Sequence, residues 1–334
     1  DASRFIQVVD IEYVGKVDTV YCLNEPYNHT FIANGVITGN CGEQPLPKHG
    51  ACNLCSINLS EYVVNPFTTD AYVDVELLQN DIKVIVEVMD EVLEENIERH
   101  ALPEQREMAR KYRNIGIGIM GIADMFVKMG LTYGSEESVG LIRKVMQIIL
   151  RYSLSWSVVF GEMKGSFPGY NKNVWESNIF THLMNNDKDS IESFKSTNAL
   201  RNATLLSVAP TGSIGTMFDV STGIEPFFRL EYVRTTKSLN GKDEDYKCEI
   251  KSLKEYHEIT GNDDIPEYFI TSDKIDWKNR INIQSAIQEF CDTGISSTIN
   301  LPKNTTLQDI KDLYLYAYDK GLKGVIFFVI DQID

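Results

Sequence analysis

Three of the six cysteines in this 334-residue chain fall within fifteen residues, at Cys41, Cys52 and Cys55. Cys41 stands two residues before Glu43, and in an extended loop this spacing puts both side chains on one side of the chain. A thiol and a carboxylate placed in this way can act on one substrate, the sulfur on carbon or hydrogen and the carboxylate on a proton. Clustered cysteines in a chain with so few are more often catalytic, redox-active or metal-binding than structural.

The pair Cys52-x-x-Cys55 also has the spacing of half a zinc site. No second pair of cysteines or histidines stands at ligand spacing elsewhere in the sequence. We therefore expect no metal ligands in this chain, and we favour redox chemistry for the cluster.

Residues 1–40, which precede the cluster, are rich in Val, Ile, Tyr, Phe and Thr and are punctuated by turn residues. This pattern predicts three or four short strands, with Asn34-Gly35 as a two-residue hairpin turn. Forty residues are too few for an independent β core, so the segment is expected to complete a partner fold.

The stretch VDTVYCLNEPYNHTFIANGVITGN, followed by Cys41, resembles the C-terminal sequence blocks of an intein. The resemblance implies that the Asn40 side chain attacks its own carbonyl and cleaves the bond to Cys41, after Cys41 has accepted the upstream segment as a thioester. It also implies that His29 polarises the junction. Gly39 departs from the family pattern, which usually has His before the terminal Asn. An intein of this kind needs an N-terminal intein half, so splicing would occur in trans or within a longer precursor.

The stretch CGEQPLPKHGACNLCSINL resembles the active-site loop of ribonucleotide reductases, and it is most similar to the adenosylcobalamin-dependent class. The resemblance implies that Cys41 carries a thiyl radical, that Glu43 is the general base and that Cys52 is one of two reducing cysteines. The family's substrate-binding Asn and its second reducing cysteine would have to come from upstream. Cys55 stands where the family usually has Gly, so it either forms an off-pathway disulfide with Cys52 or has no role.

A second motif, RNATLLSVAPTGSIG, reads as a buried strand followed by a loop that enters a helix. Such a loop offers backbone N–H groups and hydroxyls to a phosphate without needing a cation. An ordinary turn explains the loop equally well, but it also resembles the substrate-phosphate loop of the reductases. The resemblance implies that Thr211, Gly212, Ser213 and Ile214 line the phosphate site; Glu225 is left without an assigned role.

The elements that position these motifs are mostly helices. Residues 70–113 predict one or two amphipathic helices with a break near Pro103, and residues 135–162 predict another helix. Gly116, Gly118 and Gly121 superficially fit a dinucleotide-binding fingerprint, but no compact strand–helix–strand unit surrounds them, so we interpret them as packing glycines.

The net charge of −16 makes long-range attraction to nucleic acid or anionic lipid unfavourable, so we expect neither as a partner. The sequence has no apolar run long enough for a membrane helix and no signal-peptide pattern. A reducing bacterial or phage-encoded cytoplasmic setting is therefore expected.

We predict an α/β fold in two parts: a C-terminal intein segment over 1–40 and, over 41–334, the truncated C-terminal half of a ten-stranded α/β barrel of the reductase type. The implied activity is the reduction of ribonucleoside diphosphates or triphosphates, with adenosylcobalamin as cofactor and a thioredoxin-type protein as reductant. The implied partner is an N-terminal half of the protein, and a homodimer is one option for the assembly. The alternatives are a splicing element with an inactive extein, a di-iron-dependent reductase large chain and a glycyl-radical relative. Gly42 argues against the di-iron class, and the chain shows no glycyl-radical loop after Gly321.

Overall fold

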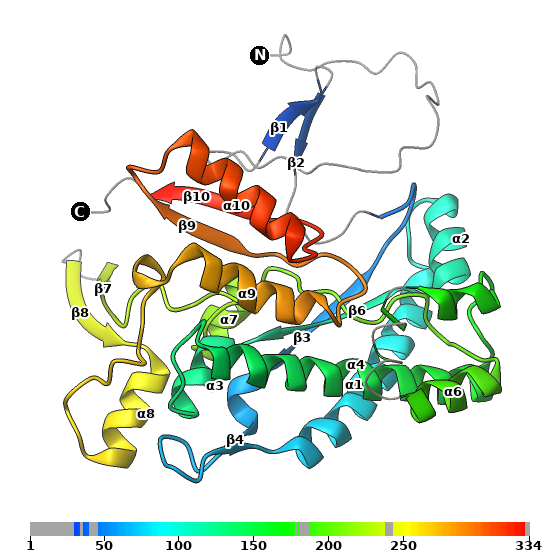
Figure 1. Ribbon diagram of the computed structural model, residues 1–334. Coiled ribbons are helices and arrows are strands. Elements are labelled where there is room, and N and C mark those ends of the chain that lie inside the picture. Colours follow the sequence, from blue (N-terminus) through cyan, green and yellow to red (C-terminus); the bar gives the residue numbers. More distant parts are fainter. Residues whose placement is uncertain are drawn as a thin grey trace.

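The structure is a computed structural model of the chain, and its helices and strands form a mixed α/β architecture (Figure 1). Helices contain more of the described residues than strands do, and the strands pair in short two-stranded sheets. The part that the structure describes comprises residues 30–33, 36–39, 46–177, 179–180, 183, 188–237 and 243–330.

A series of parallel strand pairings runs through the body. β3 (Asn53–Asn58) pairs in parallel with β6 (Ile115–Met120), and Ile117 of β6 bridges to Leu206. A second bridge joins Val208 to Ile295, which leads directly into β9.

At the far end of this series, β9 (Thr298–Pro302) pairs in parallel with β10 (Ile326–Ile330). The order is therefore β3, β6, the segment 204–209, the segment that ends in β9, and β10. Among the described residues this series does not close on itself, so a mixed α/β fold is confirmed, whereas the predicted ten-stranded barrel stays a prediction.

The helices between these strands pack on one another through apolar faces. α1 (Val75–Ile97) packs against α4 (Glu136–Lys164), and α4 packs against α9 (Trp277–Gln288), which in turn contacts α10 (Leu307–Asp319). Figure 1 shows α1 and α4 on one side of β3 and β6, and α10 beside β9 and β10.

The predicted helical region 70–113 is confirmed as two helices. α1 starts at the N-cap Asp74, whose carboxylate accepts the Leu77 N–H at 2.9 Å. α2 (Pro103–Tyr112) starts at Pro103, where a missing N–H costs nothing. One face of α1 is buried at helical spacing, and each such side chain contributes roughly 1.5–3 kcal/mol. These core residues of α1 are Leu78, Ile82, Val86, Met89, Leu93 and Ile97.

All six residues of β6 are buried, which explains why its glycines matter. A Cβ at Gly116 would lie 2.6 Å from Leu54 Cδ2, and a Cβ at Gly118 would lie 2.6 Å from the Ser207 carbonyl oxygen. Neither neighbouring strand could approach so closely if β6 carried side chains there. The interpretation of these residues as packing glycines is therefore confirmed.

Two paired strands flank Asn34-Gly35, the predicted turn, whose own residues lie outside the described ones. β1 (Thr30–Ala33) pairs antiparallel with β2 (Val36–Gly39), and Ala33 faces Val36, so the loop has two residues. The other strands predicted within residues 1–40 fall outside the described residues.

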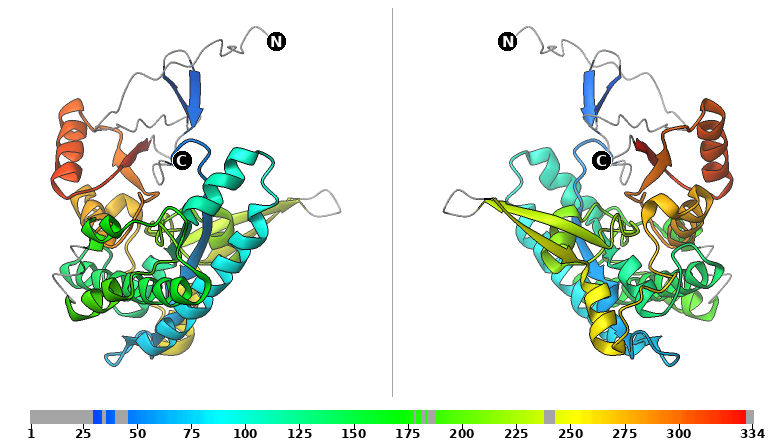
Figure 2. Two further views of the ribbon diagram at one scale, coloured as in Figure 1. Left: turned by 90° about the vertical axis from the view of Figure 1, so that its right-hand side faces the viewer. Right: turned by 90° about the vertical axis from the view of Figure 1, so that its left-hand side faces the viewer.

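The remaining elements are short or peripheral. Figure 2 shows the β7–β8 hairpin projecting from the body. Among the described residues, no helix is long and apolar enough to cross a bilayer. The short or peripheral elements are α3 (Ile122–Lys128), α6 (Lys188–Thr197), α7 (Gly212–Phe218), α8 (Lys251–Thr260), β4 (Val63–Val64), β5 (Tyr72–Val73), β7 (Glu231–Lys237), β8 (Asp243–Glu249) and the 3-10 turns Leu59–Tyr62, Lys172–Glu176 and Ser272–Lys274.

Candidate functional site

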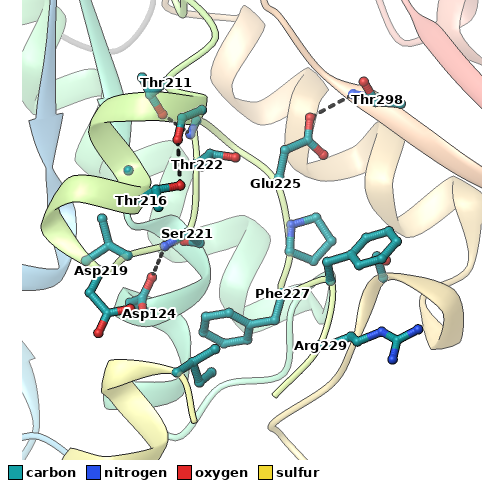
Figure 3. A pocket seen from close by; sticks show the side chains of 18 of the residues that line it. Asp124, Thr211, Thr216, Asp219, Ser221, Thr222, Glu225, Phe227, Arg229 and Thr298 are labelled. Carbon is teal, nitrogen blue, oxygen red and sulfur yellow. Dashed lines mark hydrogen bonds between the residues drawn. The ribbon is translucent and has the colours of Figure 1, made fainter. Parts of the chain in front are cut away.

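A cavity of about 1010 Å³ opens beyond the carboxyl ends of β6 and of segment 204–209 (Figure 3). Its walls come from three places: the loop after segment 204–209 with α7, the loop 219–229, and the start of β9. Ligands in open parallel α/β folds bind at the carboxyl ends of the strands, so this position is the expected one for a binding site.

The predicted phosphate loop forms one wall of this cavity. Thr211 and Gly212 line it, whereas Ser213 and Ile214 are exposed on α7 and lie outside the lining. Thr211 is 3% exposed; its hydroxyl accepts the Gly223 N–H at 2.6 Å. The loop is therefore fixed in place before any ligand arrives.

The loop 219–225 is anchored to the start of α3 through Ser221. The Ser221 N–H donates to Asp124 Oδ2 at 2.7 Å, and the Ser221 hydroxyl accepts the Ala123 N–H at 3.1 Å. The Ser221 carbonyl accepts the Gly121 N–H at 2.7 Å. These three bonds tie the second cavity wall to the same helix that follows β6.

Asp124 is itself buried, with 1% of its surface exposed. Burial raises the pKa of this carboxyl, and bonds from Ser252 and Ser221 and the charge of Lys128 oppose that rise. The Ser252 hydroxyl donates to Asp124 Oδ1 and so connects α8 to the site. Asp124 thus holds three segments together, and its oxygens face protein donors.

The third wall depends on the guanidinium of Arg280 in α9, which is 4% exposed. It donates to the Ile224 carbonyl at 2.9 Å and to the carboxylate of Glu225. It also donates to the Tyr133 hydroxyl, to Ser297 Oγ at 3.1 Å and to the Thr298 carbonyl at 2.9 Å. One buried side chain therefore joins the loop that carries Glu225 to the beginning of β9.

Glu225 lines the cavity, but both of its oxygens are bonded to protein. Oε1 accepts the Thr298 N–H at 2.8 Å, and Oε2 pairs with Arg280. Burial raises the pKa of this carboxyl, and the charge of Arg280 works in the opposite direction. This arrangement suits a residue that shapes the cavity.

Arg229 and Lys254 are the cations among the described lining residues. In Figure 3, Arg229 lies across the cavity from Thr211. A phosphate beside Thr211 would therefore be bound mainly by N–H and hydroxyl groups, as the loop sequence predicts.

Cys52 lies just before β3, half-buried, on the face of the strand pair that carries Gly116. Its Sγ is 3.1 Å from the position that a Cβ would take on Gly116, and Ser207 Cβ is 2.8 Å from the same position. Ser207 lies on the segment that leads into the phosphate loop. The predicted reducing cysteine therefore lies close to the segment that leads into the predicted phosphate loop.

Cys55 does not form a natural pair with Cys52. Three residues along a strand separate two Cα atoms by roughly 10 Å, whereas a disulfide needs less than about 7 Å. Burial raises the pKa of Cys55 to about 12, and the charge of Cys52 adds to this rise. A hydrogen bond from the Gly118 N–H works in the opposite direction. Of the two alternatives for Cys55, the geometry of β3 disfavours the disulfide.

The other predicted chemical residues, Cys41, Glu43, Asn40 and His29, lie outside the described residues. Within the described ranges, no three His, Cys, Asp or Glu side chains gather closely enough to hold a metal ion.

Sequence reasoning missed Arg280, Tyr133 and Asp124. Asp124 follows a glycine at a helix start, which is a weak signal for a buried acid. Arg280 sits in a polar run, WKNRINIQ, where an exposed arginine is the ordinary expectation. No local sequence pattern indicates that these side chains come together around one cavity.

The chain matches the family model described as ribonucleotide reductase, barrel domain, over residues 22–328. The match begins upstream of the Asn40–Cys41 junction, and the comparisons provide no evidence for an intein segment.

Curated relatives agree with this match. The chain is 30% identical to a vitamin B12-dependent ribonucleoside-diphosphate reductase of Thermoplasma acidophilum, over 87% of this chain and 37% of that protein. It is 29% identical to the protein of the same description from Mycobacterium tuberculosis, over 87% of this chain and 41% of that protein. A ribonucleoside-diphosphate reductase large subunit of Invertebrate iridescent virus 6 is 26% identical over 100% of this chain and 34% of its own length. The chain thus spans about two-fifths or less of these relatives.

Proposed function

Because the chain belongs to the family of ribonucleotide reductase barrel domains, we propose that it supplies the substrate-phosphate site and one reducing thiol of a ribonucleoside-diphosphate reductase. The reaction replaces the 2′-hydroxyl of a ribonucleotide by hydrogen. The hydroxyl leaves as water, and two thiols become a disulfide, which balances the two electrons and two protons consumed. The observation that carries this proposal is the cavity at the strand ends, lined by Thr211 and Gly212.

The substrate diphosphate would bind against Gly212 and Thr211. A Cβ at Gly212 would meet no atom within 4 Å, so the space above this residue is open on the cavity side. Backbone N–H groups at the start of α7 could then approach phosphate oxygens directly. Ser213 and Ile214 belong to the same proposed site through their N–H groups.

The roles of the cysteine loop follow from the sequence resemblance. Cys41 would abstract a hydrogen atom from the ribose, Glu43 would accept a hydroxyl proton, and Cys52 would be one of the two thiols oxidised to a disulfide. The second thiol would come from a segment upstream of the motif. Ser207 belongs to the segment that leads to Thr211, and its proximity to Cys52 supports the proposed role of Cys52.

Adenosylcobalamin is the proposed cofactor, since the relatives from Thermoplasma and Mycobacterium are named as vitamin B12-dependent. When bound, it supplies a carbon-centred radical. The described residues fit a large macrocycle, because apolar side chains are exposed at and beside the cavity mouth: Met217 is 76% exposed, Phe218 54%, Phe228 51% and Tyr232 43%. These side chains would cover one face of the macrocycle and exclude water from the cavity.

Splicing at Asn40–Cys41 is the second candidate function, and it rests on the sequence motif alone. The division into an intein segment (1–40) and a reductase body (41–334) belongs to the same hypothesis. Intact mass spectrometry after mixing with an N-terminal partner tests it: loss of residues 1–40 with a ligated product would support splicing, and an unchanged mass would exclude it. A thioredoxin-type reductant, a homodimer and a cytoplasmic setting remain parts of the reductase proposal.

Calorimetric titration with inorganic pyrophosphate tests the phosphate site. Gly212→Ala should weaken binding by tenfold or more, since the added methyl group fills the space needed for a phosphate oxygen. Gly140→Ala is the matched control, because a Cβ there also meets no atom within 4 Å but lies on α4, outside the cavity lining. Both substitutions should leave folding intact. Equal affinities of native protein and Gly212→Ala, or no binding by the native protein, would refute the proposed site.

A further inference from the structure

The hydroxyl of Ser207 has no hydrogen-bond partner among the described residues, although the residue is 0% exposed. Its backbone is paired normally, with the Ser207 N–H donating to the Ile117 carbonyl at 3.1 Å. Burying a hydroxyl without a partner costs roughly 1–3 kcal/mol, so such a group in a folded protein calls for a reason.

The surroundings of Gly116 supply a reason. The position that a Cβ would take on Gly116 is 2.8 Å from Ser207 Cβ and 3.1 Å from Cys52 Sγ. The Ser207 Cβ and the Cys52 sulfur are therefore no more than about 6 Å apart. Because the hydroxyl oxygen is one bond from Cβ and rotates about the Cα–Cβ bond, it can turn toward the sulfur. The absence of a side chain at Gly116 keeps the space between them open.

We propose that the Ser207 hydroxyl donates a hydrogen bond to the Cys52 sulfur when that thiol is ionised, so that Ser207 is a positioning residue for thiol–disulfide exchange at Cys52. The inference rests on the proposed role of Cys52 as a reducing thiol. The thiolate is the nucleophile in exchange, and a charge-assisted hydrogen bond favours the ionised form. Proton transfer is the only change at this step: the thiol loses its proton to solvent, and the serine keeps its own.

The geometry also distinguishes the two neighbouring cysteines. Cys55 lies on β3, three residues further along, and points away from the face that carries Cys52. Its backbone pairs with β6, and its carbonyl is 3.4 Å from the position of a Cβ at Gly118. Ser207 therefore assists Cys52 selectively, and Cys55 serves as an internal reference in the same protein.

The test is the pH dependence of alkylation by iodoacetamide in the full chain, read for each cysteine by tandem mass spectrometry. Trypsin cleaves after Lys48, which separates Cys41 from the peptide that carries Cys52 and Cys55. In Ser207→Ala the midpoint for Cys52 should rise by about one pH unit, the effect of losing one hydrogen bond to an ionised group. At pH 7.5 its alkylation should then slow by roughly tenfold, while that of Cys55 should not slow. Ser207→Thr, which keeps the hydroxyl, should restore the native profile.

Ser153→Ala is the matched control, since Ser153 is also 0% exposed and its hydroxyl also lacks a partner, but it lies on α4 away from the cysteines. It should leave the Cys52 profile unchanged. A native profile in Ser207→Ala, or an equal shift in Ser153→Ala, would overturn the inference. Since alkylation needs no substrate, a shifted profile without pyrophosphate binding would retain this hydrogen bond and refute only the phosphate site.

Ser207→Ala also makes a folding prediction. Removing a buried hydroxyl that has no partner should leave the urea midpoint of unfolding unchanged or raise it. A lowered urea midpoint in Ser207→Ala would mean that the hydroxyl has a structural partner, and would overturn the inference.

Discussion

Replacing Arg280 by Met should destabilise the chain strongly, because this buried guanidinium makes five hydrogen bonds around the cavity wall. Met fills a similar volume but leaves the Glu225 carboxylate without its cation. Removing one member of a buried ion pair costs about 3–5 kcal/mol. Since the Glu225 side chain is 27% exposed and keeps the Thr298 N–H, we expect the lower end of that range, about 3 kcal/mol.

The conservative substitution Arg280→Lys separates charge from geometry. Lys keeps the positive charge but has three donors, so at least two of the five bonds are lost, at about 1 kcal/mol each. Adding Glu225→Gln to Arg280→Met should recover at least about 1 kcal/mol, because the double variant no longer buries an unpaired carboxylate. The matched control is Arg143→Lys in the Arg143–Glu289 pair, where the Arg143 side chain is 43% exposed and a loss below about 1 kcal/mol is expected.

Urea unfolding followed by tryptophan fluorescence measures these differences, and its pH dependence gives a second check. Without Arg280, the folded-state pKa of Glu225 rises further above its unfolded value. A carboxyl with a raised pKa stabilises the fold at low pH and loses that effect as pH rises through the folded pKa. The loss in Arg280→Met should therefore be smaller at pH 5 than at pH 8. Equal stability of Arg280→Met and Arg280→Lys at pH 8, or additive effects in the double variant, would refute the reasoning.

Three further predictions concern single residues. Asp90→Asn should cost about 3 kcal/mol at pH 7, because the Asp90 carboxylate is 1% exposed and pairs with Arg113 at 2.7 Å and with Arg201 at 3.1 Å. Burial works to raise the pKa of Asp90, but these two cations lower it overall, so the stabilisation is present above about pH 4 and is lost at lower pH. In urea unfolding, the stabilities of the native protein and Asp90→Asn should therefore differ at pH 7 and converge at pH 3. Gly121→Ala should cost at least about 1 kcal/mol more than Gly130→Ala in the same assay. Gly121 and Gly130 both have φ near +70°, but only a Cβ at Gly121 would lie too close to an atom of another residue, Asn58 Oδ1. Equal losses of stability in the two variants would contradict this prediction.

The third of these predictions concerns thiol reactivity. At pH 8, iodoacetamide should modify Cys55 at least tenfold more slowly than Cys52, since burial raises the pKa of Cys55 to about 12; comparable rates by peptide mass spectrometry would contradict the assignment of Cys52 as the reactive thiol.

Local sequence patterns determined most of the helices and the two motifs. The apolar spacing in residues 75–97 produces a helix with one buried face, and Pro103 starts the next helix where its missing N–H is harmless. Asn34-Gly35 predicted a hairpin from residue type alone, and the two strands that flank it pair antiparallel. The course of TLLSVAPTGSIG was predictable in part: a loop leads into α7 as expected, whereas the apolar run forms two isolated bridges in place of the predicted strand.

The neighbours of each strand were decided only by tertiary structure. Gly116 leaves open space between Ser207 and Cys52, yet the three residues are far apart in sequence and none carries a local signal for the others. Arg280 and Glu225 are 55 residues apart, and an arginine in a polar helix gives no indication that it will be buried. The sequence by itself thus determined the local elements and the chemistry of the family motifs, because backbone preferences and residue types act locally. The cavity, its buried ion pair and the unpartnered serine arise from parallel pairing between distant strands, which periodicity in a single segment cannot specify.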